Sequence, residues 1–71
     1  MTPMTKEEAA AQLDRLIQAG QARVSAQITT VLALTEAGYD TAEATEAMWR
    51  EMDALTVLRQ HQRTLFAIRN P

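Results

Sequence analysis

The sequence predicts an all-α fold: an antiparallel hairpin of two long helices that dimerises into a four-helix bundle. Alanine, leucine and methionine are strong helix formers and are abundant here. The residues that break helices are few, and they lie at Pro3, Gly20, Gly38 and Pro71. Apolar residues recur with a helical period on both sides of Gly38. A chain with so few breakers between residues 4 and 70 does not consist of many short strands.

The first helix is expected over about residues 5–37, after a flexible tail at residues 1–4. Thr5 and Glu8 form a capping box, in which each side chain can bind the backbone amide of the other residue. The apolar or small residues that follow lie within one stripe of the helix: Ala9, Leu13, Leu16, Ile17, Gly20, Val24, Ile28, Val31, Leu34 and Thr35.

Gly20 lies inside this pattern. The stripe keeps its phase across the glycine, so one continuous helix is simpler than two. A break at Ala19-Gly20, which would give three helices, is the alternative. Glycine costs about 1 kcal/mol relative to alanine inside a helix, so a packing reason for Gly20 is expected.

A tight turn is predicted at residues 38–40, between the two halves of the hairpin (5–71). Gly38 can adopt the left-handed conformation that ends helices. Asp40 and Glu43 form a second capping box, and Tyr39 can pack back on Ala44. A helix end and a helix start so close together leave room only for an antiparallel reversal.

The second helix, over about residues 41–68, has a wide apolar face made of two seams. One seam consists of Ala44, Met48, Met52, Leu55, Arg59, Gln62 and Phe66. One neighbouring helix covers one seam, so the second seam is predicted to be a dimer interface. That interface is expected to consist of Ala47, Glu51, Ala54, Leu58, His61, Leu65 and Ile68. A 71-residue chain without cysteine also needs a supplement to its small core, and a second subunit supplies one.

The expected turn predicts the register of the hairpin. Folding about Tyr39 pairs residues whose numbers sum to about 79, such as Val24 with Leu55. Gly20 then faces Arg59. The methylene groups of an arginine can cross an apolar seam while its guanidinium stays in water, which would explain the missing side chain at Gly20.

One stretch of the chain resembles a known group of proteins. The segment Ala37-Gly38-Tyr39-Asp40-Thr41-Ala42-Glu43-Ala44, followed by Met48, Met52, Leu55, Leu58 and His61-Gln62-Arg63, is similar to small helical-hairpin proteins of proteobacteria. No activity is assigned to that group, so the resemblance implies a fold and no reaction. The expected architecture also resembles the RNA-binding hairpin dimer Rop, in shape only.

Three groups of side chains are candidate binding residues. Trp49, Met48 and Met52 form an adaptable patch for a partner protein, or they seal the flank of the bundle. Arg59, Arg63 and Arg69 could contact phosphates, or they complement the negative end of the helix dipole. His61 could titrate near neutral pH, or it is a boundary histidine with no special role.

The composition limits the function. No nucleophile with a base, no glycine-rich phosphate loop and no inward Glu-x-x-His pair is present, so we predict no enzyme, no metal site and no cofactor. No apolar run approaches the length of a membrane span, and no secretory signal is evident, so a cytoplasmic protein without membrane contact is expected.

We therefore predict a small interaction module or regulator that binds itself and an unknown protein partner. A Rop-like nucleic-acid adaptor that uses the arginines is a second hypothesis, against which the net charge of −2 argues. A subunit of a larger complex is a third.

Overall fold

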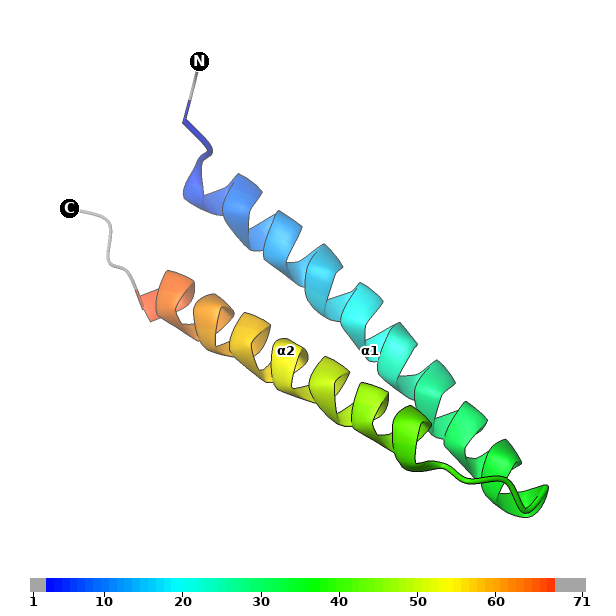
Figure 1. The fold of residues 1–71 in the computed structure, drawn as a ribbon. Helices are drawn as coiled ribbons and strands as arrows, with labels where there is room; N and C mark the ends of the chain where they lie inside the picture. The colour runs from blue at the N-terminus through cyan, green and yellow to red at the C-terminus, as the bar shows by residue number, and fades with distance from the viewer. Residues whose placement is uncertain (1–2, 68–71) are drawn as a thin grey trace.

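The chain forms two long helices that run side by side in opposite directions (Figure 1). The computed structural model describes residues 3–67, and within this range α1 spans Lys6–Glu36 and α2 spans Ala42–Ala67. No strand is present among these residues. α1 passes through Gly20 without interruption, so the chain has the two-helix fold and not the three-helix alternative. Neither described helix holds an apolar stretch that could cross a membrane.

Thr5 caps the start of α1. Its backbone is extended, and its hydroxyl accepts a hydrogen bond from the amide of Glu8 at 3.1 Å. The same hydroxyl donates to the carboxylate of Glu8 at 3.1 Å. The predicted capping box is thus present in a modified form, in which Glu8 binds the hydroxyl of Thr5.

Gly38 ends α1 in the left-handed conformation, with a φ of 79°. The amide of Gly38 donates to the carbonyl of Thr35, and the amide of Tyr39 donates to the carbonyl of Leu34. These two bonds are the Schellman motif, which satisfies the last carbonyls of a helix. Across the turn, the carboxylate of Asp40 accepts a bond from the amide of Ala42 at 3.0 Å and so caps α2.

The seam between the helices follows a seven-residue repeat. Residues of low exposure recur at alternating spacings of four and three, as in a coiled coil. On α1 they are Ala10, Leu13, Ile17, Gly20, Val24, Gln27, Val31 and Leu34. On α2 they are Ala44, Met48, Glu51, Leu55, Leu58, Gln62 and Leu65.

On α1 this seam differs from the predicted stripe, which was drawn for a period of 3.6 residues. A seven-residue repeat drifts by about 20° per repeat from that period. Leu16 and Ile28, at the two edges of the predicted stripe, therefore lie beside the seam with 45% and 42% of their surface exposed. Gln27 also lies in the seam, although the predicted stripe of apolar and small residues did not include it. On α2 the observed seam takes residues from both of the seams predicted from the sequence.

The register also differs from the predicted one, by about one helical turn. A Cβ atom on Gly20 would lie 3.1 Å from Cδ1 of Leu55, so Gly20 faces Leu55 and not Arg59. Residues of α1 and α2 that lie opposite each other along the rod then have numbers that sum to 75, whereas the predicted sum is about 79. The cause is visible in Figure 1: after Gly38 the chain runs back beside the last turn of α1 before α2 begins.

The core of this hairpin is thin. Ile17 and Leu55 are the two apolar side chains that are buried among the described residues, and they are 6% and 5% exposed. The radius of gyration is 16.6 Å, against about 11 Å for a compact chain of this length. The molecule is therefore a rod of 57 × 19 × 17 Å that exposes much of its apolar surface.

The close approach at Gly20 gives a test of the register. Gly20→Leu should lower the free energy of unfolding by about 1–3 kcal/mol, because the new side chain must displace Leu55. Thermal unfolding followed by circular dichroism measures the change. Ala19→Leu is the matched control, since Ala19 is exposed on the neighbouring position and should tolerate leucine. Equal melting temperatures for the two variants would contradict the contact.

Candidate functional site

A groove lies between the two helices at the middle of their length. It has a volume of about 410 Å³ and is open to solvent. Its apolar side chains are Val24, Met52 and Leu55, and its polar lining consists of Gln21, Ser25, Thr56 and Arg59. Leu55 is almost fully buried and forms the floor. An apolar floor with a polar rim is typical of the centre of a protein–protein interface.

Large apolar side chains continue the groove toward both ends of the rod. Ile28 is one seven-residue repeat from Gln21, Leu32 is one repeat from Ser25, and Phe66 is one repeat from Arg59. Residues seven apart lie almost in line on a helix. Ile28, Leu32 and Phe66 are 42%, 59% and 62% exposed.

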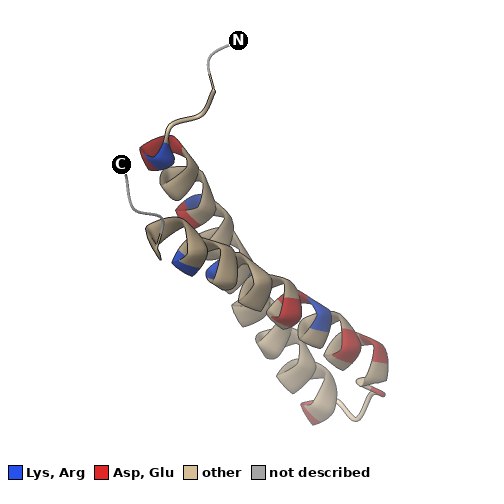
Figure 2. Cartoon of the chain, turned by 90° about the vertical axis from the view of Figure 1, so that its left-hand side faces the viewer, with Lys and Arg blue, Asp and Glu red and all other residues tan. Residues whose placement is uncertain are grey.

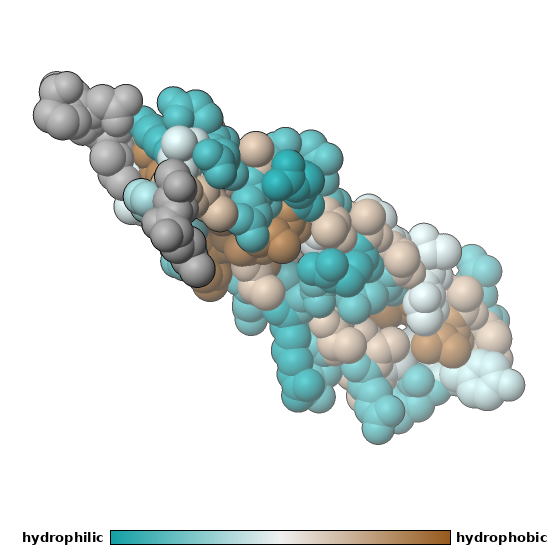
Figure 3. All heavy atoms as spheres, turned by 90° about the horizontal axis from the view of Figure 1, so that it is seen from above, coloured by the Kyte–Doolittle hydropathy of each residue, from teal (hydrophilic) through white to brown (hydrophobic). Residues whose placement is uncertain are grey.

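We call this side of the hairpin the groove face. It consists of Gln21, Ser25, Ile28 and Leu32 of α1 and of Met52, Thr56, Arg59 and Phe66 of α2. The other edge of the seam carries smaller residues, among them Ala47 and Ala54 of α2, and one large exposed apolar residue, Leu16 of α1. The surface view in Figure 3 shows apolar atoms uncovered in separate patches along the rod, between hydrophilic side chains.

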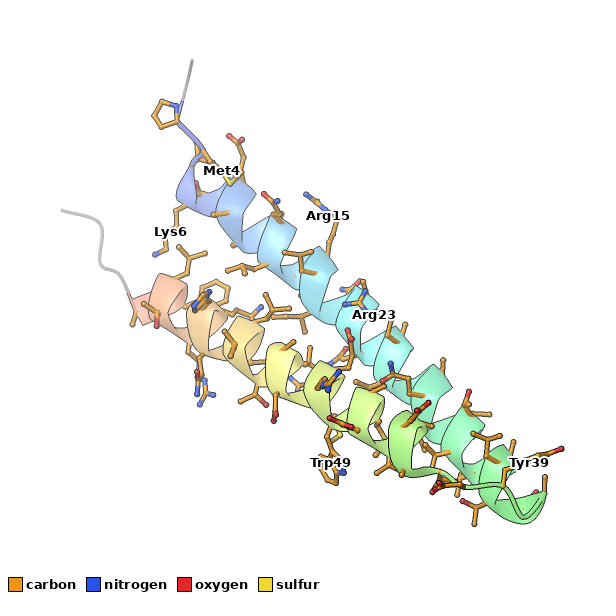
Figure 4. The ribbon with its side chains drawn as sticks, in the orientation of Figure 1. Met4, Lys6, Arg15, Arg23, Tyr39 and Trp49 are labelled. Carbon is orange, nitrogen blue, oxygen red and sulfur yellow. The ribbon has the colours of Figure 1, made fainter. Side chains whose placement is uncertain are left out.

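An ion pair joins the two helices. Nε of Arg23 donates to Oε1 of Glu51 at 2.5 Å, and the side chains are 56% and 24% exposed. Figure 4 shows Arg23 on the side of α1 that borders α2. Such a pair contributes about 0.2–1 kcal/mol, because water screens it. It therefore fixes the alignment of the helices more than it stabilises them. The sequence analysis missed this pair because the predicted register placed Glu51 one turn away.

The residues predicted as a dimer interface form two adjacent rows on α2, about 40° apart around the helix. Ala47, Ala54 and His61 are exposed. Glu51, Leu58 and Leu65 are half-buried in the seam with α1. Ile68 lies outside the described residues. The six described side chains therefore do not share one uncovered face, because half of them already pack within the hairpin.

The predicted partner patch is divided in the same way. Met48 lies in the seam and Met52 lines the groove, and both are half-buried. Trp49 is 55% exposed and points away from α1 in Figure 4. Trp49 is thus separate from the two methionines, although it is one seven-residue repeat from Thr56 at the groove rim.

The two halves of the rod differ in charge, because acidic side chains predominate toward the turn while both signs occur toward the chain ends (Figure 2). Acidic side chains gather toward the turn, where Arg50 pairs with Glu46 at 2.6 Å. Arg59 and Arg63 are exposed on the half that leads to the termini, and Arg59 also lines the groove. Arg69, the third arginine of the predicted phosphate strip, lies outside the described residues. Residues 3–67 contain no group of three or more His, Asp or Glu side chains placed to hold a metal ion.

Comparisons with family models, with curated proteins and with solved structures found no match to this chain.

Glu51 offers a test of how the seam is stabilised. Glu51→Leu removes a screened ion pair but adds apolar surface to a half-buried seam position, so we expect the melting temperature to rise by a few degrees. Glu46→Leu is the control, because Glu46 is 64% exposed and its pair with Arg50 lies outside the seam. A large loss of stability in Glu51→Leu, measured by thermal unfolding, would mean that the ion pair and not packing dominates there.

Proposed function

We propose that this chain is a non-enzymatic interaction module that acts through protein–protein contact as a homodimer, with two hairpins packed into a four-helix bundle. The observation that carries the proposal is the thin core of the single hairpin. Two helices that share one seam bury Ile17 and Leu55, while eight large apolar side chains stay exposed among the described residues. A second hairpin would cover part of that surface.

The total surface supports the same proposal. The chain has a solvent-accessible surface of 5665 Å². A compact monomer of 7.9 kDa has about 4,400 Å², so this rod exposes about 1,250 Å² more. Apolar burial contributes about 25 cal/mol per Å², so the apolar part of this excess is a source of stability once it is covered. Small domains without disulfides or metals commonly gain their stability by association.

The arrangement of the exposed apolar residues supports a module of defined geometry. On the groove face, Ile28, Leu32 and Phe66 flank an apolar floor. Polar seam residues such as Gln27 and Gln62 add specificity, because polar groups in a helical seam fix register and oligomeric state.

The proposed dimer has a direct test. Light scattering coupled to size exclusion should give twice the monomer mass of 7.9 kDa at micromolar concentration. The melting temperature should rise with protein concentration, because association stabilises the folded state by mass action. A helical monomer whose melting temperature is independent of concentration would overturn the proposal.

A further inference from the structure

We propose that the groove face is the surface on which a second copy of this chain docks, and that the two hairpins lie antiparallel, with the turn of one beside the chain ends of the other. This inference rests on the proposed homodimer and assigns its face and its orientation. The groove face carries more uncovered apolar bulk than the opposite side: Ile28, Leu32 and Phe66 against Leu16 and Val57.

The position of the groove indicates where the two-fold axis passes. Gln21 is the central residue of α1, which spans Lys6–Glu36. The α2 lining, from Met52 to Arg59, likewise surrounds the middle of α2. Two rods overlap over their full length when the axis passes through their midpoints. An axis through the groove therefore gives the largest interface.

The exposed apolar residues are spaced to fit this axis. Leu32 lies 11 residues beyond Gln21 toward the turn, and Phe66 lies 11 residues beyond Leu55 toward the C-terminus. Since Leu55 is level with Gly20, both residues are about 16 Å from the groove along the rod. In an antiparallel dimer, Phe66 of each copy therefore comes level with Leu32 of the other. In a parallel dimer, Leu32 of one copy would instead be level with Leu32 of the other, and Phe66 with Phe66.

The charges favour the same orientation. Residues 24–53 carry six acids and one arginine, a net charge of −5. The remaining described residues carry five lysine or arginine side chains and three acids, a net charge of +2. Figure 2 shows acidic side chains gathered toward the turn, with both signs of charge toward the chain ends. A parallel dimer would bring the two acidic halves together, whereas an antiparallel dimer places each acidic half beside a basic one.

The groove face is also large enough. The 26 residues of α2 extend about 39 Å, so a two-helix side 19 Å wide has a projected area of about 740 Å², close to the roughly 800 Å² per partner that standard interfaces bury. A contact along most of the rod therefore reaches the size of a specific interface. A contact over one end of the rod would be smaller than a specific interface.

Cross-linking of single-cysteine variants tests the orientation. The chain has no cysteine, so each introduced thiol is unique. Leu32→Cys and Phe66→Cys, one of them carrying a size tag, are refolded together and treated with a short bis-maleimide. We expect the mixed product, of intermediate mass, to dominate, and we expect each variant alone to give little cross-linked dimer.

The other results of this experiment separate the two proposals. Efficient cross-linking of each variant to itself would show a parallel dimer and overturn the orientation. Absence of the mixed product, in a sample that light scattering shows to be dimeric, would overturn the groove face as the interface. A wild-type protein that is monomeric by light scattering would overturn the homodimer itself.

A matched pair of variants tests the face by a second route. Leu32→Gln should raise the dimer dissociation constant at least about tenfold, because two copies of the change lie in the interface. Val57→Gln is the control, since Val57 is 48% exposed but lies about 140–160° around α2 from Met52 and Arg59. Analytical ultracentrifugation measures both constants, and circular dichroism checks that both variants stay helical. A stronger effect in Val57→Gln would overturn the assignment.

Discussion

The packing of Leu55 against Gly20 sets the register of the hairpin. A Cβ atom at position 20 would come within 3.1 Å of Leu55, so the helices approach closely where α1 lacks a side chain. Once Gly20 and Leu55 lie opposite each other, the seven-residue repeat determines which other residues of α1 and α2 lie opposite each other. The ion pair of Arg23 with Glu51 and the return of the chain beside the last turn of α1 are both consistent with this one contact.

The same seam contains polar as well as apolar residues, and this limits the stability of a single hairpin. Gln27, Glu51 and Gln62 occupy positions where a coiled coil usually places apolar residues. Oε1 of Gln27 is buried and has no hydrogen-bond partner among the described residues. Polar groups at such positions lower stability but penalise a shifted register. The hairpin thus has well-defined alignment and little core, which is why its remaining apolar surface matters for function.

Local sequence signals predicted the helix ends well, and long-range geometry poorly. Thr5, Gly38 and Asp40 act through atoms within a few residues of themselves, so the sequence is sufficient to locate the helix ends. The partners differ in part from the prediction, because Asp40 accepts from the amide of Ala42 and no bond between Asp40 and Glu43 is observed in the described part of the chain. The register depends on the path of residues 39–41, which no periodicity encodes.

The interaction surface was hidden from the sequence for a related reason. Leu32 lies outside a stripe drawn at 100° per residue, so its place on the groove face emerges only from the observed seam. The signal was present as a bulky apolar residue on a helix side predicted to be polar. A seven-residue template applied to α1 places Leu32 in line with Ser25 and Gln18, one residue after each of the seam residues Val31, Val24 and Ile17. This row lies on the outer side of the helix, and it belongs to the groove face because Ser25 lines the groove.

The helix dipole explains only part of the acidic turn. Asp40 and Glu43 lie at the start of α2, where the positive end of the dipole stabilises negative charge. Glu36 lies in the last turn of α1, which contains no basic residue and where the dipole favours cations. The dipole therefore accounts for Asp40 and Glu43 but leaves Glu36 uncompensated within one hairpin. In the proposed antiparallel dimer, the half that carries Arg59 and Arg63 comes beside this end, so one charge pattern serves both the folding of α2 and the orientation of the second copy.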